Sequence, residues 1–415
     1  MGRRRGGGRG DYEHQPCYLV LWSRCAAGTV RTGFQRQDIP VHGAISRSVS
    51  CTCTHVARRA GHAYYAGHVS LRANAVTSYR LFPVSHTLRR IALLALIPIV
   101  WGCGSSSEGS GEDGATSSLE IAVVPKGTTH EFWKAIHAGA EKAAVEFGVD
   151  VIWQGPQKED DRQLQIQVVQ NLISRGVDAI VLAPLDSRSM ARPVEAAVAR
   201  GIPVVVIDSG LESEAQSSFI ASNNYEGGRI GGQYLAEAIG GEGKVVLLRY
   251  QEGSASTTNR ERGFLDALNE YAPDAELLID NMYAGATMAK ALQVSQNILN
   301  RFPEIDAIFT PNESATQGML RALETSGRAG EVMLVGFDVN QILLDAMRDG
   351  KLHGLVVQDP VGMGYEGVKA AVSIVQGETI PERMDTRTIL VTPYNIDDAD
   401  IQELLHPDFE RWLGN

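Results

Sequence analysis

Polar side chains follow several short apolar runs that the sequence predicts to be strands. Asp208 follows Val-Val-Val-Ile, Asn312 comes soon after Ala-Ile-Phe, and Asp338 and Gln358 follow two further runs. An Arg-Glu-Arg-Gly-Phe segment at 260–264 offers a guanidinium. Carboxylates and amides accept the hydrogens of hydroxyl groups, and a guanidinium supplies a fork of donors. These side chains predict a site for a neutral, polyhydroxylated ligand.

Aromatic side chains stand beside these polar residues. Phe132 and Trp133 come shortly after the first apolar run, close to His130, and Phe337 directly precedes Asp338. Aromatic rings can cover the apolar faces of a sugar ring, and small-molecule sites combine such rings with a few placed polar groups. We therefore expect these aromatic side chains to contact the ligand as well.

Each of these residues also has a purely structural interpretation. Asp and Asn are common in loops and as helix caps. Arg262 could be one solvated charge of its segment, and Gln358 a hinge residue. The aromatic residues could pack in a core, and His130 could be a hydrogen-bonded structural histidine. Equivalent placement of Asp208 and Asp338 in two halves of the chain favours binding.

The elements that must position these residues alternate along the chain. From Leu119 onward, short β-branched runs alternate with longer amphipathic stretches, beginning with a strand at 119–125 and a helix at 130–147. The alternation restarts with a helix at 224–239 and ends with a strand at 387–391. Unbroken apolar strands separated by helices are typical of parallel sheets covered on both faces. We predict an α/β fold of two doubly wound parallel-sheet lobes, with the ligand outside the carboxyl ends of the strands.

The same segments resemble the ribose-binding branch of the type I periplasmic binding proteins. The motifs that carry the resemblance keep their order and approximate spacing: Pro125–Trp133, Ala183-Pro184, Asp208, Ser222–Asn224, Arg260–Phe264, Pro311-Asn312, Val335–Asp338 and Gln358. The resemblance runs from about Leu119 to Val391. It implies two lobes, joined by a three-segment hinge, that close on a monosaccharide such as a ribose-like pentose or a hexose. It also implies delivery of the sugar to an ABC import permease or, less often, to a membrane sensor.

The resemblance assigns roles to individual residues. The ring-stacking positions fall on Phe132, Trp133 and Phe337, and the hydroxyl-binding positions fall on His130, Asp208, Arg262, Asn312, Asp338 and Gln358. The chain also departs from the family pattern. His130 stands where the family usually has Asn, Ala183 stands where ribose binders have Asn, and Ser209 replaces an Arg that often follows the Asp.

Cys103 ends a segment with the order of an export signal. Arg89 and Arg90 precede an apolar run at 91–101, and Gly102 stands before the cysteine. The run is too short to span a membrane, which takes about 20 helical residues. The Val-Trp-Gly-Cys ending resembles a bacterial lipobox, which implies lipidation of Cys103 and a membrane-anchored lipoprotein, periplasmic or on the cell surface. A signal peptide without lipidation and a short membrane anchor are the alternatives.

Residues 1–85 differ from the rest of the chain. They hold twelve Arg, no Lys and four of the five Cys. No apolar periodicity persists in them for a full element, and an export signal belongs at an N-terminus. We interpret 1–85 as a misassigned start. The alternative is a disordered basic arm that binds nucleic acid nonspecifically.

The predicted organisation therefore has six parts. These are a mis-assigned or disordered extension (1–85), a lipoprotein signal peptide (86–103), a flexible linker (104–118), lobe 1 (119–222 with 359–386), lobe 2 (223–358 with 387–396) and a C-terminal helical tail (397–415).

Charge and missing motifs exclude several functions for the two lobes. Residues 119–415 carry 24 Lys and Arg against 43 Asp and Glu, a net charge of −19, and they contain no Cys. Such a surface repels phosphate backbones, so we expect no nucleic-acid partner. The chain lacks P-loop, HExxH and GxSxG motifs, and its glycine-rich segment 227–232 lacks dinucleotide-binding spacing. We expect no enzyme activity, no cofactor and no metal, and we take a monomer as the default.

Three alternative functions have to be weighed, and the first two share this fold. A sensory adaptor for a chemoreceptor or histidine kinase would use the same binding site. A sugar-responsive repressor would carry a helix-turn-helix before the first lobe, where this sequence has an export signal and a linker. An enzyme acting on sugars would turn its ligand over.

Overall fold

The computed structural model describes residues 58–59, 62–63 and 118–414. Strands β1 (Arg58–Arg59) and β2 (His62–Ala63) form a short antiparallel pair in one unit of the chain. The second unit contains residues 118–414, which fold into two lobes. Cys103, the predicted signal and the predicted linker lie outside the described residues. Within those residues, no helix is both long and apolar enough to cross a membrane.

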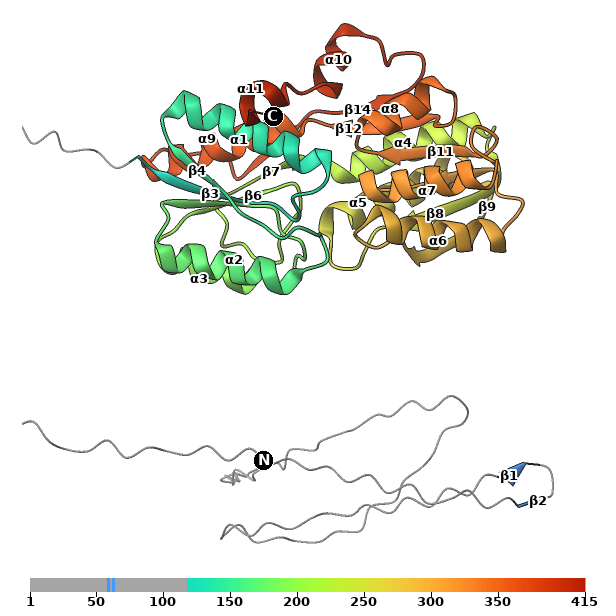
Figure 1. Ribbon diagram of the computed structural model, residues 1–415, viewed down its shortest axis with the longest axis horizontal. Helices are drawn as coiled ribbons and strands as arrows, with labels where there is room; N and C mark the ends of the chain where they lie inside the picture. Colours follow the sequence, from blue (N-terminus) through green and yellow to red (C-terminus); the bar gives the residue numbers. More distant parts are fainter. Residues whose placement is uncertain (1–57, 60–61, 64–117, 415) are drawn as a thin grey trace, which may run out of the picture. The chain divides into compact units, whose positions relative to one another are not determined.

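Lobe 1 is built on a six-stranded sheet in which every neighbouring pair runs parallel. Its order is β13-β7-β6-β5-β3-β4. The strands are β3 (Glu120–Val124), β4 (Asp150–Trp153), β5 (Ala179–Leu182), β6 (Val204–Ile207), β7 (Ser218–Ser222) and β13 (Arg383–Thr386). Helices α1 (Glu131–Phe147) and α9 (Pro360–Val375) cover one face of this sheet. Helices α2 (Arg162–Arg175) and α3 (Ala191–Val198) cover the other (Figure 1).

Lobe 2 repeats this plan with one antiparallel edge. Its order is β14-β12-β11-β10-β8-β9, and only β12 and β14 pair antiparallel. The strands are β8 (Glu242–Arg249), β9 (Asp274–Tyr283), β10 (Ala307–Phe309), β11 (Met333–Phe337), β12 (Gly354–Gln358) and β14 (Thr388–Val391). Helices α4 (Asn224–Ala238) and α5 (Ala255–Tyr271) cover one face. Helices α6 (Met288–Arg301), α7 (Glu313–Thr325) and α8 (Gln341–Arg348) cover the other.

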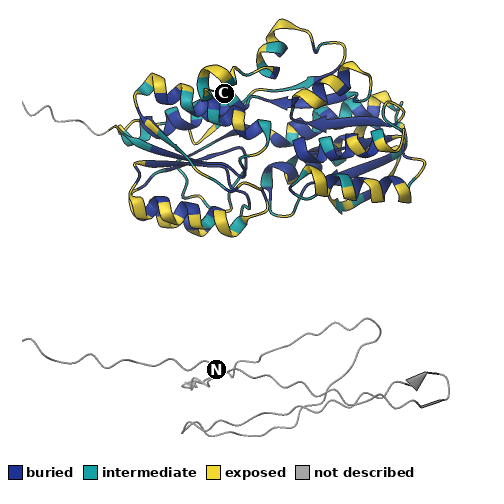
Figure 2. Ribbon diagram, in the orientation of Figure 1, coloured by how far each residue is buried: buried dark blue, intermediate teal, exposed yellow. Residues whose placement is uncertain are grey.

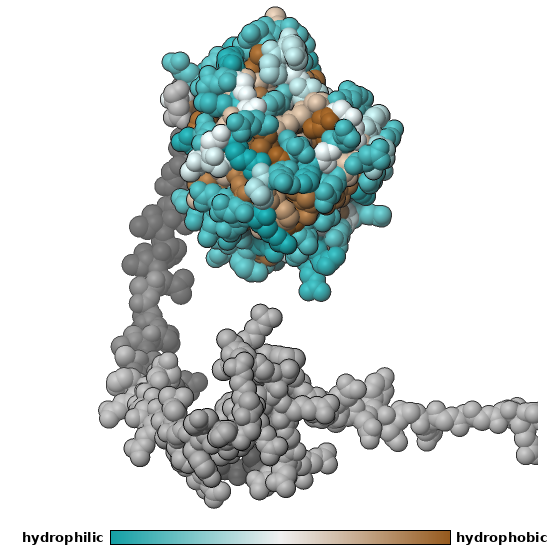
Figure 3. All heavy atoms as spheres, turned by 90° about the vertical axis from the view of Figure 1, so that its right-hand side faces the viewer, coloured by the Kyte–Doolittle hydropathy of each residue, from teal (hydrophilic) through white to brown (hydrophobic). Residues whose placement is uncertain are grey.

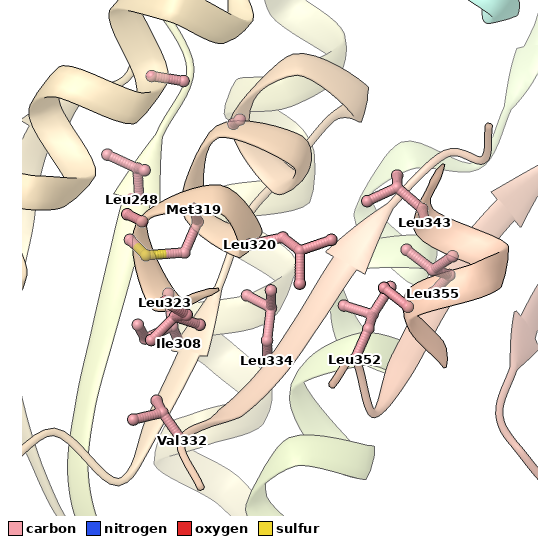
Figure 4. Packing of buried hydrophobic residues seen from close by; sticks show 14 of the residues in the cluster. Leu248, Ile308, Met319, Leu320, Leu323, Val332, Leu334, Leu343, Leu352 and Leu355 are labelled. Atoms are coloured by element: carbon pink, nitrogen blue, oxygen red, sulfur yellow. The ribbon is translucent and has the colours of Figure 1, made fainter. Parts of the chain in front are cut away.

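The helices are two-sided, and their buried sides form the cores. Figure 2 shows the central strands of both sheets buried, the edge strands partly exposed, and the helices buried on the side that faces a sheet. Helix α7 illustrates the pattern: Met319, Leu320 and Leu323 are fully buried at helical spacing. Figure 4 shows them packed against Ile308 and Leu334 of the sheet. The end face of lobe 2, seen in Figure 3, is mainly hydrophilic with smaller hydrophobic areas between.

Three chain segments cross between the lobes. They connect β7 to α4, β12 to α9, and β13 to β14. The predicted two-lobed α/β fold with a three-segment hinge is therefore confirmed. The predicted final strand at 387–391 is present as β14, and the structure adds a strand that was not predicted, β13, directly before it. β13 belongs to the lobe 1 sheet and β14 to the lobe 2 sheet, so Arg387 lies at the crossing.

Glycines in α4 permit close packing rather than phosphate binding. A Cβ on Gly227 would lie 2.8 Å from the Phe337 ring, and one on Gly231 would lie 2.8 Å from the Phe309 ring. A Cβ on Gly228 would collide with the backbone carbonyl of Arg260 in α5. The small residues therefore let α4 approach both the sheet and α5, and this approach positions Arg260.

Candidate ligand-binding site

The carboxyl ends of both sheets meet around a buried polar cluster. Its lining residues come from both lobes: Lys126, His130, Phe132, Trp133, Glu159, Asp208, Tyr250, Ser256, Thr257, Arg260, Asn312, Glu313, Asp338 and Gln358. The void that they enclose has a volume of about 30 Å³. A void of that size holds about two water molecules, since one needs roughly 10–15 Å³. The structure is therefore a closed form of the two lobes.

Seven of the nine ligand residues predicted from the sequence line this void. They are His130, Phe132, Trp133, Asp208, Asn312, Asp338 and Gln358. Phe337 lies beneath the site instead, fully buried in the lobe 2 core. Arg262 is exposed and lies outside the site.

The prediction that Arg262 faces the cleft is wrong, and Arg260 takes that place. The two arginines are both on α5 but two residues apart, about 200° around the helix. The Arg262 guanidinium lies over the Tyr225 ring, 5.0 Å from its centre. The Arg260 guanidinium stacks on the Phe337 ring at 3.9 Å. Phe337 therefore acts as a platform for Arg260, which is a positioning role.

Arg260 is held from several sides within the site. Its Nε donates to Asn224 Oδ1 at 2.7 Å, and its Nη1 donates to the Pro311 carbonyl at 2.9 Å. Its guanidinium lies 3.9 Å from an Asp208 carboxylate oxygen and 3.7 Å from one of Asp338. The cation therefore sits between one carboxylate of each lobe.

These two carboxylates share an unusual backbone conformation. Asp208 directly follows β6 with φ 60°, and Asp338 directly follows β11 with φ 67°. Among the described residues they alone have positive φ without being glycine. The Asp208 amide donates to the Ile220 carbonyl at 3.0 Å and that of Asp338 to the Val356 carbonyl at 2.9 Å, so neighbouring strands hold the strained turns. Such strain concentrates at ligand sites, and here it turns both side chains into the cleft.

Lys126 supplies a second cation opposite Arg260. Its Nζ lies 2.7 Å from Asp208 Oδ2 and donates to Ser256 Oγ of lobe 2 at 3.0 Å. The Lys126 side chain is almost completely buried. Lys126 follows Pro125, shortly after the end of β3. It therefore stands where ligand groups are expected in a parallel sheet, although it was not among the predicted ligand residues.

Glu159 connects three side chains of the site. Its carboxylate lies 2.5 Å from His130 Nδ1 and accepts from Trp133 Nε1 at 2.8 Å and from the Tyr250 hydroxyl at 2.7 Å. Tyr250 belongs to lobe 2, so this contact also joins the lobes. Burial alone would raise the pKa of Glu159, but the hydrogen bond and charge of His130, with the bonds from Trp133 and Tyr250, lower that pKa to about 2.

His130 carries the complementary charge. Burial alone would lower the pKa of His130, but the hydrogen bond and charge of Glu159, together with the charges of Glu313 and Asp338, raise that pKa to about 9. His130 precedes α1 in extended conformation without capping it through its side chain. The histidine is therefore a cation at neutral pH, fixed toward the cleft by Glu159.

Lobe 2 contributes two carboxylates with the opposite tendency. Burial raises the pKa of Asp338 above its usual range, although Arg260 and a 2.6 Å hydrogen bond from Gln358 oppose the rise. Burial likewise raises the pKa of Glu313, which accepts from the Phe132 amide at 3.3 Å and from Asn340 Nδ2 at 3.0 Å. Both groups are held at the centre of the site in a low dielectric.

Several buried polar atoms of the cluster have unused hydrogen-bonding capacity. Asn312 Oδ1, Gln358 Oε1 and Arg260 Nη2 have no hydrogen-bond partner, and all three side chains are at least nine-tenths buried. Buried polar atoms without partners are rare in native structures and call for a ligand or water. Two acceptors and one donor without partners therefore belong to side chains that line the void. In the described part of the chain, no group of three or more His, Cys, Asp or Glu side chains is arranged to hold a metal ion.

Sequence reasoning did not include several residues of the cluster. Lys126 lies two residues after β3, Tyr250 directly follows β8, and Glu313 directly follows Asn312, so position alone could have indicated them. Glu159 stands in a Glu-Asp-Asp loop between β4 and α2, where nothing local distinguishes it from its solvated neighbours.

Two parallel-sheet lobes that bury a polar cluster between their strand ends have the architecture of a bilobal binding protein. Residues 121–379 match the family model described as the periplasmic binding protein domain. The chain therefore belongs to this family.

Relatives and solved structures of the family resemble most of this chain. It is 30% identical over 298 residues to the ribose import binding protein RbsB of Bacillus subtilis (strain 168), which covers 72% of this chain and 93% of that protein. A carbohydrate transporter solute-binding protein from Agrobacterium radiobacter, solved with D-arabinose, has a TM-score of 0.68 and 33% identity, over 70% of this chain and all of that one. An ABC transporter solute-binding protein from Agrobacterium vitis with bound D-fucose has a TM-score of 0.67 and 32% identity, over 69% of this chain and all of that one.

Proposed function

We propose that this protein captures a monosaccharide by closing its two lobes and delivers it to an ABC import permease. The observation that carries the proposal is the buried cluster, in which charged, amide and aromatic side chains from both lobes surround unpartnered polar atoms. A sugar offers many hydroxyl groups, each of which both donates and accepts hydrogen bonds. It can therefore satisfy the free acceptors of Asn312 and Gln358 together with the free donor of Arg260.

The aromatic residues favour a ring-shaped ligand with apolar faces. Phe132 and Trp133 lie edge to face with ring centres 5.0 Å apart, and both line the void. Because Glu159 holds the Trp133 indole N–H, the ring is fixed in one orientation. A pyranose or furanose ring can pack its C–H face on such a surface while its hydroxyl groups reach Asp208 and Asp338.

Three hydrogen bonds join the lobes in the closed form, and they link ligand entry to lobe opening. Lys126 bonds Ser256 across the cleft, Glu159 bonds Tyr250, and Glu313 bonds the Phe132 amide. These bonds must break for a sugar to enter, since the closed void holds only about 30 Å³. A bound sugar would then favour the closed state by contacting both lobes at once.

We place the protein outside the cytoplasm, on a membrane through lipidated Cys103. The relatives support an extracytoplasmic setting, because one is an import binding protein and the two solved structures are solute-binding proteins of transporters. The lipobox-like ending at Cys103 supports the anchor. Metabolic labelling with a fatty acid analogue tests it: the label should enter the protein and be absent from Cys103→Ser.

A thermal-shift screen tests the ligand class. The purified protein is heated with pentoses, hexoses, sugar alcohols, nucleosides or amino acids. A ligand at about 100 times its Kd stabilises a protein by roughly 2.7 kcal/mol. We expect a shift with one or a few sugars, its loss in Asp208→Ala and Asp338→Ala, and its retention in Arg262→Ala, which changes an exposed residue outside the site. The bound sugar should be recovered unchanged. A shift only with another ligand class would refute the proposal.

A further inference from the structure

The C-terminal tail contacts both lobes beside the ligand site. It contains α10 (Ala399–Leu405) and α11 (Phe409–Leu413), beyond the residues that match the family model. Ile401 and Leu405 of α10 are buried in the lobe 2 core. Helix α11 packs against α1 of lobe 1. Figure 1 shows the tail, in red, lying over the strands at the hinge.

A cavity of about 280 Å³ lies beneath this tail. Lobe 1 contributes Phe132 and Ala135 of α1 to its lining. The tail contributes Leu404, Pro407 and Phe409. Lobe 2 adds three aliphatic side chains: Val339, Leu344 and Val357. Glu131, Gln341 and His406 add polar groups to the lining, but most of the lining side chains are apolar, and they come from three parts of the fold. The volume is close to the lower limit of typical small-molecule pockets, which is about 300 Å³.

This cavity adjoins the polar cluster. Phe132, Asp338 and Gln358 line both spaces. Gln358 is 2% exposed, its Nε2 donates to Asp338 Oδ1 at 2.6 Å, and its Oε1 has no partner. A mainly apolar cavity thus shares a wall with the hydroxyl-binding cluster, and Gln358, whose Oε1 has no partner, belongs to that wall. A ligand that is polar at one end and apolar at the other matches this sequence of surfaces.

We infer that the cavity under the tail accepts a short alkyl or aryl group attached to the bound sugar, so that glycosides are the preferred ligands. The inference rests on the proposed function, because the sugar part would occupy the polar cluster. The apolar substituent would leave water and contact Phe132, Leu404 and Phe409. Burial of apolar surface supplies the gain in affinity, and a butyl or phenyl group should lower Kd by at least about tenfold relative to the free sugar.

Isothermal titration calorimetry on the whole protein tests the inference. The probes are D-ribose, D-arabinose and D-fucose, each as the free sugar and as both anomers of the butyl and phenyl glycoside. The filling variant is Leu404→Trp, which occupies the cavity from a half-buried position of α10. The matched control is Glu403→Trp, which places the same ring on the neighbouring exposed position.

The expected result is a glycoside that binds at least about tenfold more tightly than its free sugar, since it buries additional apolar surface. Leu404→Trp should abolish this gain while changing the Kd of the free sugar less than about twofold, and Glu403→Trp should preserve the gain. Glycosides that bind no better than free sugars, or a gain that survives Leu404→Trp, would overturn the inference and leave the proposed function standing. Absence of binding by every sugar and glycoside would overturn both.

A second variant covers the case in which Leu404→Trp also loses free-sugar binding. Phe409→Ala removes one wall of the cavity from the tail. It should reduce the gain of the phenyl glycoside and leave the free sugar unaffected. An unchanged gain in Phe409→Ala would count against the inference.

Discussion

The ion pair of His130 and Glu159 predicts a loss of stability at alkaline pH. The pKa of His130 is raised from an ordinary value of 6.5 to about 9 in the folded protein. A raised pKa stabilises the fold fully below the unfolded value, and the contribution is lost as the pH rises through the folded value. The window is therefore pH 6.5 to about 9. The shift corresponds to roughly 3 kcal/mol, at about 1.4 kcal/mol for each pKa unit.

The lowered pKa of Glu159 describes the same ion pair from its other side, so the two shifts are not added. Its contribution is present above about pH 4.5 and is lost as the pH falls through about 2. The alkaline window is the one used for the test, because it follows from the raised pKa of His130.

Urea unfolding of the protein and of His130→Gln, from pH 6 to pH 10, measures the effect. The quantity of interest is the free energy of unfolding of the unchanged protein minus that of the variant. This difference should be larger at pH 6 than at pH 10 by roughly 3 kcal/mol. The comparison removes contributions from groups that both proteins share. Glu159→Gln should reduce the pH dependence of the free energy of unfolding in the same window, because the neutral amide does not attract the imidazolium as a carboxylate does. A difference between protein and His130→Gln that stays constant from pH 6 to pH 10 would refute the reasoning.

Three further substitutions test other parts of the site. Arg260→Met should lower the free energy of unfolding, measured in urea, by roughly 3–5 kcal/mol, because it leaves buried carboxylates without a counter-charge. The exposed control Arg262→Met should change it by less than about 0.5 kcal/mol. Equal effects of the two substitutions would contradict the assignment of Arg260 to the site. Gly228→Ala should cost at least roughly 1–3 kcal/mol by the same assay, because its Cβ collides with α5, while Gly210→Ala meets only ordinary contacts and should cost less than about 1 kcal/mol. Asp338→Asn keeps a residue that tolerates positive φ, so the free energy of unfolding should change by less than about 1 kcal/mol. Calorimetry should show that sugar affinity falls at least about tenfold. Retained affinity would show that Asp338 does not bind the ligand.

Strand ends were predictable from the sequence because a parallel sheet has a simple rule. Ligand groups follow the strands, and unbroken apolar runs such as those before Asp208 and Asp338 mark the strands clearly. The same rule covers Lys126 and Tyr250, which were not among the predicted site residues. What the rule cannot give is the conformation at the strand end. Both aspartates reach the cleft through left-handed turns, which depend on hydrogen bonds to neighbouring strands.

Helical phase was the main source of error at the site. An Arg-Glu-Arg segment offers two guanidinium groups on different sides of α5, and the sequence does not say which side faces the cleft. The close approach of α4 at Gly228 settles it by burying Arg260 and leaving Arg262 in solvent. The same packing explains the position of Phe337, whose ring lies beneath the Arg260 guanidinium and supports it. Tertiary contacts between elements far apart in the chain therefore decide what local spacing leaves open.

The closed form explains why binding and lobe motion must be linked in this protein. Lys126, Glu159 and Glu313 each use one hydrogen bond to join the lobes directly. A sugar enters only after these bonds break, so the closed form competes with binding and reduces the apparent affinity by the fraction that is open. In the function we propose, the sugar replaces these hydrogen bonds between the lobes with bonds to Asp208 on one side and Asp338 on the other. The closed state is then held by the ligand itself, and a permease that recognises the closed lobes would receive a loaded protein.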